Sequence, residues 1–198
     1  MFYALSGKIL GKDPAKVNRV AAREIAQDKI RTIDDSFQRE EYIQGVMRVV
    51  EEHVAGLPTS DLSLTLKHIH NPGPLRVIGD YDFERKGFRP AGLFFQDGHK
   101  QPFFNLTDSV GCMVELRYAK PFNGYLLDVR YPVADQQVAR AIESHRVNDN
   151  LVVRLFIEPV EIDENHTNLV VKVKAIKFET KGGQALGQAD RLPGETKS

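Results

Sequence analysis

The chain lacks several features that would place it in a large class of proteins. Cys112 is its only cysteine, so no intrachain disulfide can form, which fits a reducing compartment. Its 27 basic residues balance 27 acidic ones, whereas a duplex nucleic-acid binder usually carries a basic excess. No apolar run approaches the roughly 20 residues of a membrane span, and no signal peptide is present. We therefore expect a soluble protein, cytoplasmic by default, or exported if a signal peptide has been removed from this chain.

Strong catalytic motifs are also missing from the sequence. No Gly-rich phosphate loop follows a predicted strand, and no Gly-x-Ser-x-Gly is present. We therefore expect no cofactor, and the sequence favours a protein that is not an enzyme while leaving that question open.

Two helices are predicted near the N-terminus. Asp13 and Pro14 are typical of a helix start, because Asp caps the free N–H groups and Pro suits the first helical position. A second helix starts near Asp35, and its apolar residues recur at i, i+3, i+4 and i+7, as on one buried helix face. These residues are Ile43, Val46, Met47, Val50, Val54 and Leu57. The apolar segment Met1–Leu10 is read as a short strand or an anchoring arm.

Strands dominate the rest of the chain, and Gly111–Phe178 is the most regular part. It reads as strand, tight turn, strand, helix, strand, loop and strand. The last two strands should pair antiparallel, and the first of them should end at Pro159, which cannot donate to an interior ladder. Their inward residues are predicted to be Leu151, Val153, Leu155, Ile157, Val171 and Val173, with Lys172 and Lys174 outward.

These patterns predict an α+β fold. N-terminal helices should pack on a twisted antiparallel β-sheet or half-open barrel, with one further helix between late strands. We expect a single domain over residues 1–181, mainly helical over 1–58 and mainly β over 61–180. Gly182–Ser198 is rich in Gly and polar residues and lacks apolar periodicity. It is therefore predicted to be a disordered tail.

Two pairs of polar residues are candidates for metal or catalytic chemistry. His68 and His70 stand two apart, so on a strand they share a face, as a metal-binding pair would. Asp80 and Asp82 share a face in the same way and could serve a small hydrolase together with the histidines. The alternative is structural: half-exposed histidines at a strand end, and carboxylates in solvated ion pairs. We favour that alternative and expect no metal.

A charged surface is predicted on two strands of the central block. Glu115, Arg117, Asp128 and Arg130 fall on the outward faces of strands that one turn joins. Opposite charges across such strands stabilise a sheet by a few tenths of a kcal/mol. We expect an exposed charge ladder, which could also be a binding surface.

Aromatic residues interleaved with lysines suggest a further possibility. Single-stranded nucleic acid is held by stacking on aromatic rings beside basic side chains. The residues in question are Phe94, Phe95, Lys100, Phe103, Phe104, Lys120 and Phe122.

Short motifs carry a resemblance to a known family. Asp35–Glu40 is a helix start of the acidic-Phe-x-Arg type, and Gly79–Phe88 is a strand of the type Gly-x-Tyr-Asp-Phe-x-x-x-x-Phe. Tyr131 and Pro132 precede a small helix, and Phe178–Leu186 is a strand with a Gly-containing end. Together these motifs resemble a bacterial family of uncharacterised proteins with a domain of unknown function, and they cover most of the chain.

The resemblance implies no catalytic residue. The matched residues Tyr81, Phe83 and Phe88 are expected to be core aromatics, and Arg39 and Asp82 could form a structural ion pair between helix and strand. The hypothesis we carry forward is a non-enzymatic binding or protein-interaction domain. The first alternative is the small hydrolase with a site near His68, His70, Asp80 and Asp82, and the second is single-stranded nucleic-acid binding. The sequence leaves the oligomeric state open.

Overall fold

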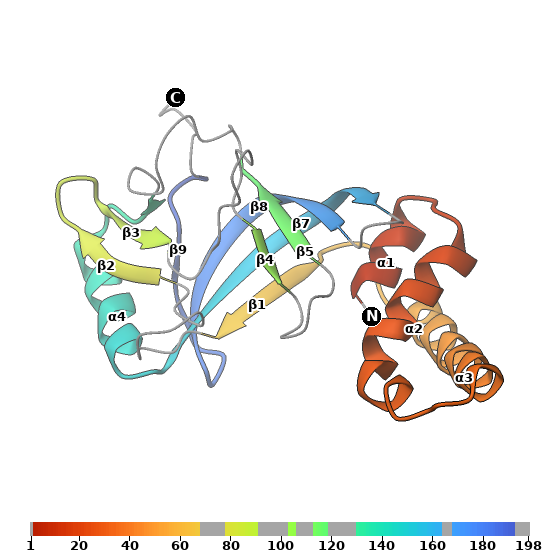
Figure 1. The fold of residues 1–198 in the computed structure, drawn as a ribbon. Coiled ribbons are helices and arrows are strands. Elements are labelled where there is room, and N and C mark those ends of the chain that lie inside the picture. Colours follow the sequence, from red (N-terminus) through yellow and green to blue (C-terminus); the bar gives the residue numbers. More distant parts are fainter. Residues whose placement is uncertain are drawn as a thin grey trace. The chain divides into compact units, whose positions relative to one another are not determined.

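The computed structural model describes residues 2–67, 78–90, 103–105, 113–118, 130–163 and 168–192. Among these residues, three helices lead the chain, antiparallel sheets follow, and a fourth helix lies between late strands (Figure 1). The predicted α+β class is confirmed, and within the described part the sheets do not close into a barrel. The chain divides into two compact units, one built on residues Met1–Ser60 and the other holding most of the strands and the fourth helix.

The first unit contains three helices, of which the middle one contacts both others, together with short pieces of strand. They are α1 (Phe2–Ile9), α2 (Pro14–Ile30) and α3 (Ser36–Ala55). The two predicted helix starts are confirmed. The Asp13 carboxylate accepts a hydrogen bond from the Ala15 N–H at 3.0 Å, and Asp35 caps α3 in the same way. The α3 face that packs inward is formed by Ile43, Val50 and Val54.

The strand that was one of two alternatives for the first ten residues is not formed, because α1 is a helix. A short apolar run fits either structure by periodicity alone. Here five consecutive residues from Tyr3 to Gly7 are buried, and the Ser6 hydroxyl donates to the Phe2 carbonyl at 2.9 Å inside the helix. The packing against α2 and α3, which the sequence pattern does not carry, selects the helix.

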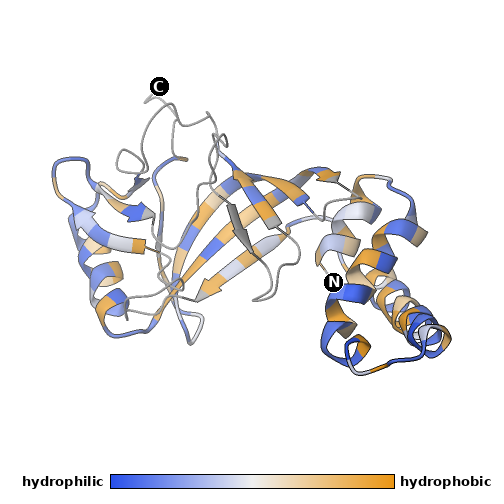
Figure 2. Cartoon of the chain, in the orientation of Figure 1, coloured by the Kyte–Doolittle hydropathy of each residue, from blue (hydrophilic) through white to orange (hydrophobic). Residues whose placement is uncertain are grey.

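The larger sheet is antiparallel and contains the two longest strands. Its order is β1-β7-β8-β5-β4, and β9 pairs with β8. The strands are β1 (Ser63–Lys67), β4 (Phe103–Asn105), β5 (Met113–Arg117), β7 (Leu151–Asp163), β8 (Asn168–Thr180) and β9 (Ala185–Gln188). In Figure 2 apolar and polar positions alternate along much of β7 and β8. The six residues predicted to face inward on these strands are all buried, while Lys172 and Lys174 are exposed, so the predicted register is confirmed.

Pro159 does not end its strand as predicted, because β7 continues to Asp163. The register pairs β1 with residues 152–156 of β7, and the Ile157 N–H donates to the Leu62 carbonyl at 2.9 Å. Two residues further along, Pro159 points its nitrogen to the same side, where β1 has already ended. The missing N–H therefore removes no bond to β1, and the strand tolerates the proline.

The predicted disordered tail is ordered over residues 182–192. Strand β9 pairs with β8, and the Ala189 N–H donates to the Ile176 carbonyl at 2.9 Å. Asp190 is held twice: its N–H donates to the Pro132 carbonyl at 2.8 Å, and its carboxylate accepts from the Ala134 N–H at 2.6 Å. Leu192 is buried. A polar, Gly-rich segment can be ordered by backbone hydrogen bonds that leave no periodicity in its own sequence. Residues 193–198 lie outside the described part.

A smaller antiparallel sheet, in the order β2-β3-β6, belongs to the second unit. Its strands are β2 (Ile78–Asp82), β3 (Gly87–Pro90) and β6 (Tyr131–Pro132), and helix α4 (Gln136–Val147) packs against β2 and β9. The predicted late helix is thereby confirmed. At Gly87 a Cβ atom would lie 2.7 Å from the Tyr131 carbonyl oxygen, so only glycine lets β3 and β6 approach this closely.

Candidate functional site

The smaller sheet and α4 bring together several residues that the sequence singled out. Asp82 is half-buried and Arg130 is buried, and the guanidinium donates from Nε and Nη2 to Asp82 Oδ2 at 3.1 and 2.7 Å. The other carboxylate oxygen of Asp82 accepts from the Glu84 and Arg85 N–H groups at 3.1 and 3.0 Å. The Arg85 N–H and then the Arg130 guanidinium lower the pKa of Asp82, so this carboxylate stays ionised. It is a structural anchor and is poorly suited to be a general acid.

Asp80 has a different arginine as its partner. Arg146 of α4 is only 3% exposed, and its Nη2 donates to Asp80 Oδ1 at 2.8 Å and to Glu143 Oε1 at 2.6 Å. The Glu143 carboxylate raises the pKa of Arg146. Because each aspartate has its own arginine, the described geometry matches the predicted structural ion pairs better than a pair of catalytic carboxylates. His68 and His70, which would complete the hydrolase, lie outside the described residues.

Two buried tyrosines add a neutral polar contact to the second unit. The hydroxyl groups of Tyr118 and Tyr131 are 3.1 Å apart, and their rings are tilted with centroids 6.4 Å apart. Burial raises the pKa of Tyr131 to about 12 and that of Tyr118 well above its ordinary value. Both phenols therefore stay protonated at neutral pH, and one donates to the other.

The structure describes three of the four residues of the predicted charge ladder. Glu115 and Arg117 are half-exposed and pair with each other along β5, with Arg117 Nε 3.1 Å from Glu115 Oε1. Arg130 is buried instead of outward, because the Asp82 carboxylate draws it into the protein. Asp128 lies outside the described residues. Arg39 and Asp82, suggested as an ion pair, each have another described partner: Arg39 donates to the Ile33 carbonyl at 2.8 Å, and Asp82 accepts from Arg130.

An apolar cavity lies between β2, the turn after it and α4, with a volume of about 150 Å³. Its lining consists of Tyr81, Phe83, Gln136, Ala139, Arg140 and Glu143. Tyr81 is fixed at the wall, because its hydroxyl donates to the Val133 carbonyl at 2.8 Å. Phe83 packs edge-on against Tyr81, with centroids 5.2 Å apart and rings at 87°.

Phe83 was expected in the core, but the structure exposes 79% of it. The reason is local. Asp82 caps a turn by accepting hydrogen bonds from the two N–H groups that follow Phe83, so the chain leaves the strand at that residue. Asp82 followed by charged residues could have predicted this turn. The alternation of polar and apolar residues instead suggested that the strand continues. Of the other two matched aromatic residues, Phe88 is fully buried as predicted, whereas Tyr81 is only half-buried.

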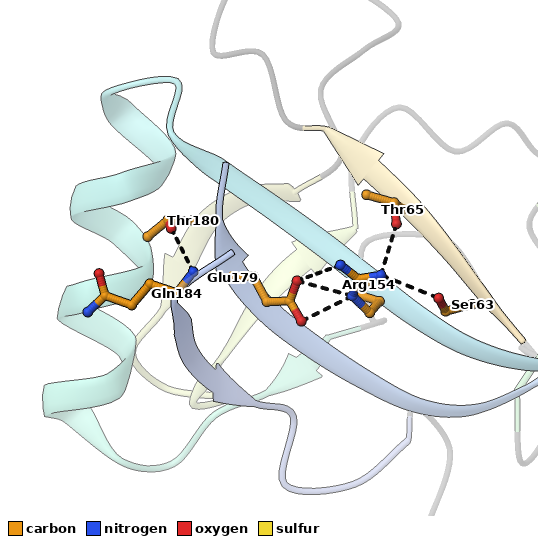
Figure 3. Close-up of polar contacts among 6 residues, drawn as sticks. All are labelled: Ser63, Thr65, Arg154, Glu179, Thr180 and Gln184. Atoms are coloured by element: carbon orange, nitrogen blue, oxygen red, sulfur yellow. Dashed lines mark hydrogen bonds and ion pairs between the residues drawn. The ribbon is translucent and has the colours of Figure 1, made fainter. Parts of the chain in front are cut away.

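The outer face of the larger sheet is a second polar surface. Figure 3 shows Arg154 of β7 between Glu179 of β8 and the hydroxyl groups of Ser63 and Thr65 on β1. The shortest of these contacts joins Arg154 Nη2 to Glu179 Oε2 at 2.8 Å. In the same close-up the Gln184 N–H donates to the Thr180 hydroxyl at 3.0 Å and fixes the turn into β9.

Most basic side chains on this face have partners among the described residues, although Lys172 is exposed without an ion pair. Lys174 pairs with Glu158 at 2.8 Å, and Lys177 lies over the Phe156 ring at 4.9 Å from its centroid. A surface for single-stranded nucleic acid needs free cations and open aromatic faces. This face therefore supports that alternative poorly, and most residues that first suggested it lie outside the described part or have undescribed side chains.

The chain matches no protein-family model, no curated protein and no solved structure. Within the described residues, no helix is long and apolar enough to cross a membrane. The same residues contain no group of three or more His, Cys, Asp and Glu side chains that could hold a metal ion.

Proposed function

We propose that the chain is a non-enzymatic protein-interaction domain whose α4–β2 cavity takes an apolar side chain of a partner protein. The observation that carries this proposal is Phe83, a large aromatic side chain that is 79% exposed at the cavity rim. Exposed aromatic residues beside apolar pockets are typical of binding hot spots, because a partner recovers the burial energy that the free protein lacks.

The walls of the cavity support the proposal because they are held before any partner arrives. Tyr81 is tied to the Val133 carbonyl, and α4 is tied to β2 through Arg146 and Asp80. A preformed site avoids much of the ordering cost of binding. The cavity of about 150 Å³ has room for one large apolar side chain but not for a drug-sized ligand, which needs at least about 300 Å³.

Charge at the rim indicates what should flank that side chain. Arg140 is exposed and forms no ion pair with any described residue, whereas the Glu143 carboxylate is already bonded to Arg146. Arg140 is therefore the charged lining residue that has no ion-pair partner among the described residues. We infer that the partner segment carries an apolar residue next to an aspartate or glutamate, which pairs with Arg140.

A random peptide library displayed on phage tests this. Wild-type protein should enrich peptides with an aromatic or leucine residue beside an acidic one. Phe83→Ala should weaken the binding of the synthesised peptides by about 30-fold, which corresponds to a hot spot of roughly 2 kcal/mol. Phe37→Ala is a matched control, because Phe37 is equally exposed at 80% on α3. Arg140→Glu should shift enrichment toward basic peptides.

Two outcomes would contradict the proposal. One is that no peptide sequence is enriched over several rounds. The other is that enriched peptides bind Phe83→Ala and Phe37→Ala equally well, which would place their site elsewhere.

The hydrolase and the family resemblance stay predictions. No described contact favours the hydrolase, since both aspartates are bound to arginines and the histidines are not described. Zinc offers a direct check, because binding to the native state must stabilise it. We expect no zinc-dependent rise in melting temperature. A rise that disappears in His68→Ala would promote the hydrolase.

A further inference from the structure

Helix α3 has a second apolar stripe besides the face that it packs inward. Its members follow the spacing i, i+3, i+4 and i+7 and are Tyr42, Gly45, Val46 and Val49. Val49 is 63% exposed and Tyr42 is 38% exposed, while Val46 is intermediate. We refer to these four residues as the α3 stripe. At Tyr42 and Val49 the stripe is open among the described residues.

Gly45 in the middle of the α3 stripe packs against no other element among the described residues. A Cβ atom built at this position would meet no described atom within 4 Å. Glycine weakens a helix interior relative to almost any other residue, so a glycine here needs another reason. Close approach of a second helix is such a reason, because a residue without a side chain lets two helix backbones come together.

Charged residues border the α3 stripe in a self-complementary order. Glu41 precedes Tyr42 and Arg48 precedes Val49, so the two charges lie on one edge of the stripe, two helical turns apart. Both are exposed, and neither forms an ion pair with a described residue. Gly45 lies close to the midpoint between them. A two-fold axis near Gly45 would therefore place each Glu41 opposite Arg48 of a second, antiparallel helix.

We propose that the α3 stripe is a self-association surface, on which a second copy of this chain docks through its own α3 in antiparallel orientation. Tyr42 then packs against Val49 of the other copy, and the two glycines lie at the crossing point. The Glu41–Arg48 pairs form twice and fix the direction of the helices. A contact made by one helix of each copy is smaller than most stable interfaces, so the dimer should be weak, with a dissociation constant on the order of 100 µM.

Analytical ultracentrifugation of the full chain between about 10 µM and 1 mM tests the proposal. Wild type should pass from monomer to dimer over this range. Glu41→Arg and Arg48→Glu should each weaken the dimer about five- to tenfold, because each turns two attractions into two repulsions. The double variant should return to within about twofold of wild type. Lys29→Glu on α2 makes the same charge change as Arg48→Glu away from the stripe, and it should leave the dimer unchanged.

Gly45→Gln provides a second test, because it should raise the melting temperature of the monomer and weaken the dimer. The dilute variant should melt at a higher temperature than wild type, because Gln is the better helix former and its Cβ atom would meet no other described element within 4 Å. Its dimer should weaken beyond detection, because the longer side chain keeps the backbones apart.

Three results would overturn the proposal. The first is a wild-type monomer throughout the concentration range. The second is a double charge variant whose dimer is as weak as that of the single variants, since antiparallel pairing requires the second change to restore the affinity. The third is a dimer that Phe83→Ala abolishes, because the surface would then be the α4–β2 cavity; that result would leave the proposed interaction function standing.

Discussion

The energy of burying Leu155 is the prediction that the structure allows us to work out most fully. Leu155 is fully buried in β7, lies opposite Leu64 of β1 and belongs to the inward row that runs from Leu151 to Ile157. Leu155→Ala removes three carbon atoms from this core. At about 0.8 kcal/mol for each buried carbon, the lost transfer energy is about 2.4 kcal/mol.

The cavity left behind adds to that cost. It would measure up to roughly 80 Å³ if no neighbour moved, and at about 24 cal/mol per Å³ this adds up to about 2 kcal/mol. Strands on both sides of β7 limit collapse of the site. We therefore expect Leu155→Ala to lower the free energy of unfolding by about 2.5–4.5 kcal/mol.

Urea denaturation at 25 °C measures this directly, provided that the slope of the transition stays that of wild type. Lys172→Ala on β8 is the control, because its side chain is exposed, and its unfolding free energy should stay within about 0.5 kcal/mol of wild type. If the two variants proved equally stable, the inward register of β7 would be refuted, because a one-residue slip exchanges every inward and outward position.

Three further predictions concern the C-terminal segment, a glycine and an ion pair. Truncation after Lys181 should lower the melting temperature by more than about 4 °C, because β9 and its hydrogen bonds are lost; a thermal melt matching wild type would support a disordered tail instead. Gly87→Ala should destabilise by about 1–3 kcal/mol in urea melts, since its Cβ would overlap the Tyr131 carbonyl, and a neutral effect would contradict the close β3–β6 packing. Arg19 holds the pKa of Glu40 at about 2, below its ordinary 4.5. This stabilisation is present above pH 4.5 and is lost as the pH falls toward 2, so wild type should lose more stability there than Arg19→Gln does. Parallel pH profiles of the two proteins would contradict that assignment.

Much of the fold could be predicted because its causes are local in the sequence. Asp13 and Asp35 start their helices by bonding to N–H groups two or three residues away. The rows of β7 and β8 alternate because one face is buried, and that alternation is visible in the letters alone. The α+β class follows from the order of these elements.

Long-range partners explain what the sequence did not reveal. Arg130 is inward because Asp82, 48 residues earlier, accepts its hydrogen bonds. Asp190 orders the C-terminal segment through the Ala134 N–H, 56 residues earlier. Neither contact changes the pattern of polar and apolar residues in the segments that it joins, so the pattern does not predict it. The exposure of Phe83 was missed for a local reason. Asp82 caps the turn that follows, so the strand ends inside a sequence whose alternation looks continuous.

Pro159 has a consequence for how the larger sheet meets other chains. Beyond Phe156 the edge of β7 that faced β1 continues without it, as far as the structure describes this strand. A strand edge that lacks a neighbouring strand invites another strand to add to it, which is a common start of aggregation. Proline removes the one donor that a newcomer would need at that step of the ladder. Pro159, which the sequence suggested as the end of β7, thus hinders the addition of a foreign strand where β1 no longer pairs with β7.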